Sequence, residues 1–321
     1  MAENKMSLFD QLQDLMIQNH FRPEKKLSQF FCINEALLQY LVNRATLKEG
    51  DVVLEIGPGT GFLTRIILDR AKKIGAKVVA VELDENMYTL LSQLFSSEIA
   101  KGELNLILGD ALEQDLGELK INKVISLPPY HISSALVSKI TLAKGIEKAV
   151  LVLDRGFVDK VIAFEGFTEY GSLTALVNLN AKAEVVENNI APQSFFPPPN
   201  CQSAVLQLDF DTKNNSMEYF TFLKELFRHK NKDLQKALRQ SIGFLAKSLK
   251  WDPKEIESSI SKMPFAQKKV YLLAPQELLK VYDYLTSSKD SKKESKEEIK
   301  KIKVKKIKSI IKKEKSEPFV L

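Results

Sequence analysis

The sequence predicts an α/β fold with a mainly parallel sheet, followed by a smaller domain made only of helices. Segments rich in Val, Ile and Leu alternate with amphipathic segments from residue 52 to residue 128, and this alternation is typical of β-α-β units. From about Met217 the apolar residues recur at three- and four-residue spacing, which indicates helices. The chain has 321 residues, and because domains usually hold roughly 100 to 200 residues, more than one folded unit is expected.

The expected elements follow one another along the chain. Each strand is a short apolar run that contains β-branched residues, and each helix shows an apolar stripe. The strands are expected at residues 52–57, 77–83, 104–110, 122–128, 148–154, 183–189 and 203–210, and the helices at 61–74, 85–95, 222–245 and 275–285.

These elements divide the chain into four expected parts. They are an N-terminal leader (1–26), an α/β domain (27–212), a helical domain (213–288) and a Lys-rich tail (289–321) that we expect to be disordered. The tail holds 13 Lys and 6 Asp or Glu, which leaves 34 basic and 35 acidic residues in the rest of the chain. The net charge of +6 therefore comes from the tail and does not by itself indicate a nucleic-acid partner.

Composition and cysteine content exclude several classes of protein. With 44% hydrophobic and 27% charged residues the chain is globular overall, and it has neither the roughly 18-residue apolar run of a membrane helix nor a signal peptide. Cys32 and Cys201 lack the spacing of a disulfide framework or a thiolate metal site. We therefore expect a soluble, cytoplasmic protein with no metal and no membrane partner.

A glycine-rich turn is the strongest functional signal. The segment EIGPGTG, from Glu55 to Gly61, lies between an expected strand and an expected helix, and Gly57 and Gly59 let the backbone approach a ligand that a Cβ would exclude. A dinucleotide fingerprint needs a third glycine where Phe62 stands, which disfavours an NAD-dependent oxidoreductase. S-adenosylmethionine has no pyrophosphate to bind, so the G-x-G-x-G pattern suits it better.

Acidic residues end the next two expected strands. Glu82 is placed to accept both ribose hydroxyls of a bound nucleoside, and Asp110 to reach an adenine amino group, with Ala111 leaving room for the ring. Either residue alone is more often a helix N-cap or a solvated loop residue. Their joint position at the carboxyl edge of one sheet, where open α/β folds bind ligands, favours a nucleoside site.

A proline-rich loop, SLPPYHIS at residues 126–133, follows the fourth strand. Enzymes that methylate an exocyclic amine need a rigid loop with oxygen acceptors and an aromatic face for the base. The prolines supply the rigidity and Tyr130 supplies the face. Pro-Pro-Tyr also occurs in ordinary turns, but its position at a strand end favours a role in the site.

Together these segments resemble the rRNA adenine N6,N6-dimethyltransferase family, which acts on small-subunit ribosomal RNA. The resemblance runs from about Leu27 to Leu279 and includes YGSL at 170–173, FFPPPNCQSAV at 195–205 and FRHKNKDLQKAL at 227–238. It implies a Rossmann-like class I methyltransferase domain with a small C-terminal all-helical domain that helps to grip RNA. It also implies S-adenosylmethionine as cofactor and N6-dimethylation of adenosines during assembly of the small ribosomal subunit.

The resemblance also implies which residues bind the donor. The family's G-Q-N-F-L loop is replaced by SQFFC at residues 28–32, which keeps Gln29 and Phe31 but loses the Asn. The residues expected to bind the cofactor are Gln29, Phe30, Cys32, Gly57, Gly59, Gly61, Glu82 and Asp110.

The acceptor loop aligns with the family's N-L-P-Y motif in two ways. Without a gap, Leu127 replaces the Asn, and the side-chain oxygen that positions the target amine is lost. With one proline inserted before Tyr130, Ser126 takes the place of the Asn and could hold the amine. The residues expected to act in catalysis are therefore Ser126, Leu127, Pro129 and Tyr130.

A basic segment in the helical domain contains the expected RNA contacts. Basic side chains on one helix track phosphates without reading bases, and they disfavour a small-molecule methyltransferase. The residues, expected to lie within one helix, are Arg228, Lys230, Lys232, Lys236 and Arg239. The expected function is thus methylation of rRNA adenosines by a monomer, and the alternative is a catalytically weakened family member that acts as an RNA-binding ribosome-assembly factor.

Overall fold

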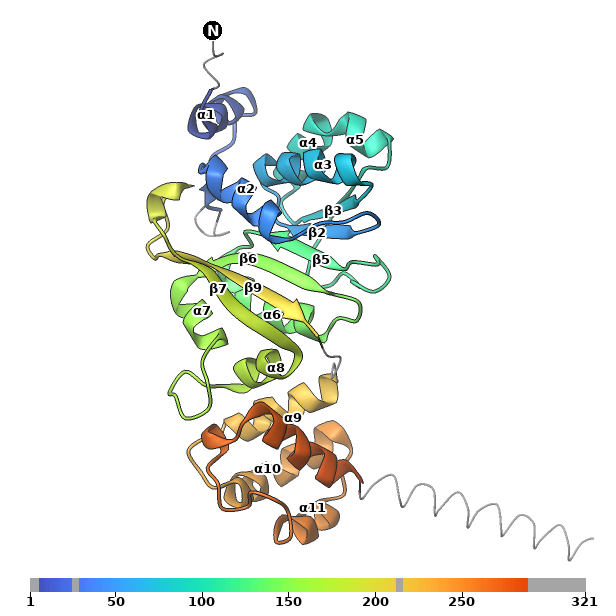
Figure 1. The fold of residues 1–321 in the computed structure, drawn as a ribbon, viewed down its shortest axis with the longest axis vertical. Helices are drawn as coiled ribbons and strands as arrows, with labels where there is room; N and C mark the ends of the chain where they lie inside the picture. The colour runs from blue at the N-terminus through green and yellow to red at the C-terminus, as the bar shows by residue number, and fades with distance from the viewer. Residues whose placement is uncertain (1–5, 25–28, 212–215, 288–321) are drawn as a thin grey trace, which may run out of the picture. The chain divides into compact units, whose positions relative to one another are not determined.

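A computed structural model describes residues 6–24, 29–211 and 216–287 of the chain (Figure 1). The chain divides into two compact units, with the division between Phe220 and Thr221. The Lys-rich tail from residue 289 lies outside the described residues. Within them, no helix is both long enough and apolar enough to cross a membrane.

A seven-stranded sheet forms the centre of the first unit, in the order β4-β3-β2-β5-β6-β9-β7. The first five strands in this order are parallel, and β9 is antiparallel to both of its neighbours. The strands are β2 (Val52–Ile56), β3 (Lys77–Glu82), β4 (Leu104–Leu108), β5 (Lys123–Ser126), β6 (Lys148–Asp154), β7 (Ala181–Ile190) and β9 (Ser203–Phe210). All seven strands expected from the sequence are therefore confirmed, and the predicted α/β class with them.

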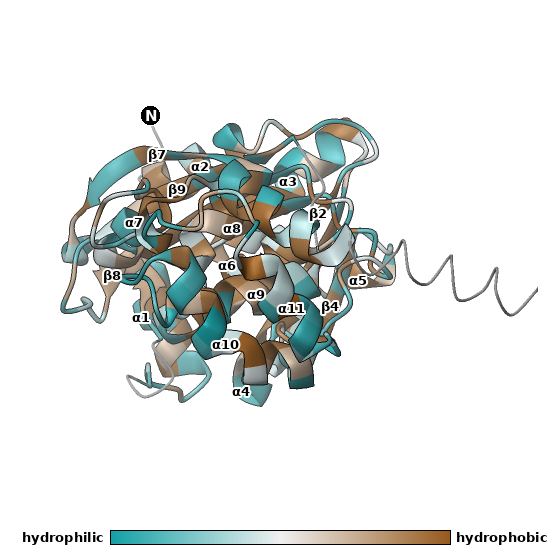
Figure 2. Cartoon of the chain, turned by 90° about the horizontal axis from the view of Figure 1, so that it is seen from below, coloured by the Kyte–Doolittle hydropathy of each residue, from teal (hydrophilic) through white to brown (hydrophobic). Residues whose placement is uncertain are grey.

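The sheet is covered by helices on both faces because its strands are apolar on both faces. Two separate hydrophobic clusters result, one with α2, α3 and α4 and the other with α6, α7 and α8. In Figure 2 the helices carry both brown, hydrophobic and teal, hydrophilic stretches, as expected of amphipathic elements. The helices of this unit are α2 (Glu35–Arg44), α3 (Phe62–Ile74), α4 (Glu85–Leu94), α5 (Ser96–Ala100), α6 (Ser133–Leu142), α7 (Arg155–Val161) and α8 (Ser172–Asn180).

The N-terminal region contributes structure that the sequence analysis did not anticipate. Within the expected leader, α1 (Leu8–Gln18) begins at the N-cap Ser7 and places the fully buried Leu12 in the core. A two-stranded sheet then pairs β1 (Phe31–Cys32) with β8 (Phe195–Phe196). This pairing joins segments more than 160 residues apart, which local periodicity does not reveal.

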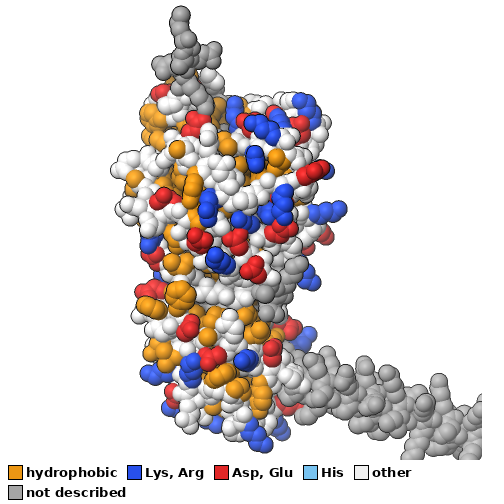
Figure 3. Space-filling view, viewed as in Figure 1, with side chains coloured by type: hydrophobic (Ala, Val, Ile, Leu, Met, Phe, Trp, Pro, Cys, Tyr) orange, Lys and Arg blue, Asp and Glu red, His pale blue; other side chains and the backbone are white. Residues whose placement is uncertain are grey.

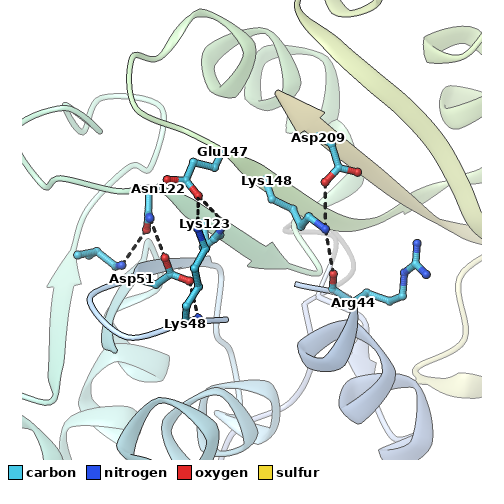
Figure 4. A network of polar contacts seen from close by, with 9 residues as sticks. Arg44, Lys48, Asp51, Asn122, Lys123, Glu147, Lys148 and Asp209 are labelled. Atoms are coloured by element: carbon cyan, nitrogen blue, oxygen red, sulfur yellow. Dashed lines mark hydrogen bonds and ion pairs between the residues drawn. The ribbon is translucent and has the colours of Figure 1, made fainter. Parts of the chain in front are cut away.

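A polar network joins the strands at their amino ends, the edge opposite the glycine-rich turn (Figure 4). The buried Lys123 amine lies 2.8 Å from the Glu147 carboxylate. Asn122 accepts a hydrogen bond from Val52 N and donates one to Asp51 Oδ1, both of 2.8 Å. Further ion pairs join Lys48 to Glu147 and Lys148 to Asp209. The starts of β2, β5 and β6 and the end of β9 are thereby held together.

The second unit is helical, as predicted. It contains α10 (Leu234–Leu249), α11 (Pro253–Ile260) and a helix at residues 275–287, while α9 (Met217–Phe227) runs across the division between the units. Its core includes an aromatic cluster of Phe222, Trp251 and Tyr282, with ring centroids 5.4 to 6.0 Å apart.

One helix prediction is wrong, because residues 222–245 form two helices and not one. α9 ends at Phe227 and α10 begins at Leu234, after the N-cap Asp233. The residues between them pair with a distant segment, since Lys230 O and Lys232 O accept hydrogen bonds from residues 271 and 270, and Leu234 N donates to residue 268. Their backbone groups are therefore satisfied outside a helix.

Candidate functional site

A cavity of about 380 Å³ opens at the carboxyl edge of β2, β3 and β5 in the first unit. The strand order reverses between β2 and β5, and open α/β sheets bind ligands at such a switch point. Nine residues expected in the site line this cavity: Gln29, Phe30, Cys32, Gly57, Gly59, Glu82, Asp110, Leu127 and Pro129. Three others do not: Gly61, Ser126 and Tyr130.

The glycine-rich turn needs its glycines for two different reasons. Gly57, Gly59 and Gly61 all have positive φ angles, between 54° and 77°. A Cβ at Gly59 would lie 3.0 Å from the ring of Phe31, inside the cavity wall. A Cβ at Gly61 would lie 2.6 Å from the ring of Phe95, away from the cavity. The structure thus corrects the expectation for Gly61, which permits close packing at the start of α3 and does not line the cavity.

Glu82 closes the turn from the neighbouring strand. Its Oε2 accepts a hydrogen bond from Gly59 N at 3.0 Å, and its Oε1 accepts one from Asp84 N at 2.9 Å. Burial is the main cause that raises the pKa of Glu82, and these two backbone N–H groups oppose the rise. A carboxylate oxygen has room for a second donor, so ribose hydroxyls could bind here without displacing the turn.

Asp110 and Gln29 both line the cavity, and hydrogen bonds hold each of them in place. Asp110 Oδ1 accepts a hydrogen bond of 2.7 Å from Leu112 N, which holds the carboxylate at the end of β4. Gln29 donates from Nε2 to Asp84 Oδ2 at 2.9 Å, and its Oε1 accepts from Glu24 N. The segment before β1 is therefore tied to the loop after β3.

Glu55 is a site residue that the sequence analysis did not assign. It lines the cavity with its side chain almost fully buried, and Oε2 has no hydrogen-bond partner among the described residues. Burial raises the pKa of this carboxyl to about 8, the nearby Thr64 hydroxyl opposes the rise, and the nearby Glu82 adds to it. The sequence signal that could have identified Glu55 is a charged residue inside the apolar run VVLEIG, because burying an acidic side chain costs free energy unless it has a partner.

The acceptor loop resolves the choice between the two alignments. Ser126 is fully buried and donates its hydroxyl to Ile56 O at 2.7 Å, so this side chain joins β5 to β2. Leu127 lines the cavity instead. The structure therefore contradicts the expectation that the Ser126 hydroxyl holds the amine, and it favours the alignment in which Leu127 stands where the family has Asn.

Tyr130 follows the cavity-lining Pro129 and is held on several sides. Its phenol oxygen lies 2.5 Å from Ser203 Oγ, and its ring packs against Phe30 with centroids 6.0 Å apart and an angle of 33°. Burial raises the pKa of Tyr130 to about 12, so the phenol stays protonated at neutral pH. The contact with Ser203 joins residues 73 positions apart and has no local sequence signal.

The basic residues of the second unit lie in the loop after α9 and on α10, not within one helix as expected. Several have acidic or amide partners, and the exposed ion pairs among them contribute little to stability, about 0 to 1 kcal/mol. Figure 3 shows acidic and basic side chains interspersed on the visible face. The contacts are Arg228 with Glu225, Lys232 with Gln240, Lys236 with Asp233 and Arg239 with Glu257.

Comparison with known proteins connects this site to one family. Residues 20–256 match the family model described as ribosomal RNA adenine dimethylase. A protein of Thermococcus gammatolerans named "Probable ribosomal RNA small subunit methyltransferase A" is 35% identical over 277 residues, which are 86% of this chain and 94% of that protein. A protein of the same name from Methanopyrus kandleri is 36% identical over 225 residues, 68% of this chain and 76% of that protein.

Solved structures agree on the fold. A dimethyladenosine transferase from Plasmodium falciparum has a TM-score of 0.63 at 24% identity, over 78% of this chain and 95% of that chain. The 23S rRNA methyltransferase ErmE has a TM-score of 0.54 at 22% identity, over 79% of this chain and 99% of that chain. The predicted Rossmann-like domain with C-terminal helices is confirmed.

Proposed function

Because this chain belongs to the ribosomal RNA adenine dimethylase family, we propose that it transfers methyl groups from S-adenosylmethionine to the N6 atoms of adenosines in small-subunit ribosomal RNA. The observation that carries this proposal is the cavity at the carboxyl edge, where Gly59, Glu82 and Asp110 lie together inside the matched residues 20–256. The family match and the G-x-G-x-G turn both favour S-adenosylmethionine over NAD.

The cavity residues fit the donor in charge as well as in shape. S-adenosylmethionine carries an α-ammonium group, and the buried Glu55 carboxylate has an oxygen without a partner among the described residues. An ammonium group would lower the pKa of Glu55 from about 8 and stabilise the ionised form. We assign Glu82 to the ribose and Asp110 to the adenine amino group, as the sequence analysis expects.

The chain's own part in methyl transfer is positioning. When bound, S-adenosylmethionine would supply a methyl group on a sulfonium. The adenine N6 would form a bond to that methyl in line as the C–S bond breaks, which would leave neutral S-adenosylhomocysteine, and the N6 proton would pass to solvent. Tyr130 supplies a face for the flipped base, and neutral phenol suits this role because it neither gives nor takes a proton. Leu127 offers no side-chain oxygen, so backbone carbonyls of residues 126–128 are left to accept the amine's hydrogen bonds.

The second unit contributes RNA contacts in this proposal. Arg228, Lys236 and Arg239 have side chains 49 to 69% exposed, and their weak ion pairs can be exchanged for phosphates. The domain limits, the monomeric state, the absence of a metal and the cytoplasmic location remain predictions. The relatives are named as methyltransferases, which favours an enzyme over an assembly factor without catalysis.

The decisive experiment is transfer of labelled methyl groups from S-adenosylmethionine to small ribosomal subunits that lack the modification. Transfer to adenosine N6, identified after digestion of the RNA, is the expected result. Tyr130→Ala should reduce transfer strongly and leave donor binding unchanged. If the protein binds the donor and the immature subunit but transfers no methyl group, the assembly-factor function replaces the enzyme.

A further inference from the structure

We infer that Ser203 is a positioning residue for methyl transfer, because its hydroxyl holds the phenol of Tyr130 and thereby fixes the ring face that receives the adenine. This inference rests on the proposed function. Ser203 Oγ and the Tyr130 phenol oxygen are 2.5 Å apart, and Ser203 is fully buried. A serine with no contact to the cavity would thus control a residue at its rim.

The anchor of this contact is a rigid part of the sheet. Ser203 begins β9, and it pairs with Asp154 of β6 on one side and with Ile190 of β7 on the other. A residue flanked by two strands has little freedom to move, so the Ser203 hydroxyl has a well-defined position from which to hold the Tyr130 phenol. Contacts supported by such elements hold a site more accurately than loop contacts do.

The other end of Tyr130 is held as well. Ser133 donates its hydroxyl to Tyr130 O at 2.8 Å, and two prolines precede the tyrosine. With the backbone fixed on one side and the phenol on the other, few ring orientations remain. The ring is therefore already arranged for stacking, and little conformational entropy is lost when a base arrives.

The segment that ends at Ser203 also reaches the donor side of the site. Ser194 O accepts a hydrogen bond of 2.8 Å from Ile33 N, and Phe195 and Phe196 pair with Cys32 and Phe31. Residues 194–203 thus brace the donor-side strand at one end and the acceptor tyrosine at the other. This arrangement gives the FFPPPNCQSAV motif a physical role: it sets the separation of the two substrates.

A double-mutant cycle tests the inference. Ser203→Ala and Tyr130→Phe each remove one hydroxyl of the pair, and each should lower kcat/KM for immature subunits by about tenfold while the donor Kd stays unchanged. Because the two hydroxyls act as one unit, the double variant should be no worse than either single variant. Thr141→Val is a matched control, since it removes another buried hydroxyl, which is bonded to Val137 O on α6 and does not line the cavity.

Two results would overturn the inference. One is a double variant about a hundredfold less active, the product of the single effects, since the hydroxyls would then act independently. The other is a crystal structure of Ser203→Ala in which the Tyr130 ring keeps its place against Phe30. This structure also separates the two proposals: if the wild-type protein transfers no methyl group, the proposed function fails, while the ring position in Ser203→Ala still decides whether Ser203 holds Tyr130.

Discussion

The carboxylate of Glu82 accepts a hydrogen bond from the backbone N–H of Gly59 at 3.0 Å, so the end of β3 is tied to the glycine-rich turn that follows β2. The turn is thereby held in its ligand-binding conformation by the residue assigned to the ribose. The proposed ribose contact and the geometry of the turn therefore rest on the same side chain.

Glu82→Ala should weaken S-adenosylmethionine binding by roughly 1 to 3 kcal/mol, because hydrogen bonds to a charged acceptor are lost and the turn loses its support. Titration calorimetry measures this change. Glu85→Ala, which removes an exposed acid three residues further on, serves as the control. Equal donor affinity in wild type and Glu82→Ala would contradict the assignment.

Glu55 should make the stability of the free protein depend on pH. Its folded pKa of about 8 lies above the ordinary 4.5, so its contribution is fully present below pH 4.5, is lost as pH rises towards 8, and is constant above that. The loss is on the order of 5 kcal/mol for a fully buried group. Urea denaturation from pH 5 to 9 measures it.

Glu55→Gln is the matched variant for this prediction. It should remove most of the pH dependence of the free energy of unfolding. A smaller slope in the same direction should remain from Glu82, whose pKa is also raised by burial. An unchanged slope in Glu55→Gln would show that other groups cause the dependence.

Leu127→Asn should raise the methyl transfer rate by up to roughly tenfold, or leave it unchanged, because it adds a side-chain oxygen where the cavity wall is apolar. Single-turnover transfer to immature subunits is the measurement. Leu108→Asn adds the same side chain at an exposed leucine outside the cavity and should have no effect. A large fall in rate for Leu127→Asn would indicate that the leucine itself is needed.

Lys236→Ala and Arg239→Ala should weaken RNA binding to a similar extent on all sequences. Each should also reduce the slope of log affinity against log salt by about 1, since each releases one counterion fewer. Filter binding between 50 and 200 mM salt, roughly the range in which phosphate contacts lose affinity, measures this. Lys101→Ala, on an exposed residue of the first unit, is the control. Identical slopes for all proteins would exclude these two residues as phosphate contacts.

Glu147→Gln should lower the free energy of unfolding by about 3 kcal/mol, because the buried Lys123 amine would lose its carboxylate 2.8 Å away. Lys123→Met should cost less, since it removes the buried charge itself. Chemical denaturation compares the two, with the exposed Glu118→Gln as reference. The prediction fails if Lys123→Met proves the more damaging change.

Sequence patterns predicted those parts of the fold that local periodicity encodes. The strands that contain Glu55 and Glu82 are apolar runs that each include an acidic residue. The sheet and the edge proposed to bind a ligand could therefore be predicted from the sequence. The break between Phe227 and Leu234 could not, because it depends on hydrogen bonds to residues near 270. The alignment of Leu127 likewise needed the observation that Ser126 is bonded to Ile56.

The position of β9 between β6 and β7 has a consequence for biosynthesis. A chain emerging from the ribosome presents β6 and β7 with unpaired edges until residues 203–210 appear, and such edges expose an unfinished chain to aggregation. Until residue 203 is synthesised, the phenol of Tyr130 also lacks its hydrogen-bond partner, the Ser203 hydroxyl. A nascent or truncated chain that ends before Ser203 therefore contains the glycine-rich turn but lacks the hydroxyl that holds Tyr130. Under the proposed function, we expect such a chain to bind the donor before it can transfer a methyl group.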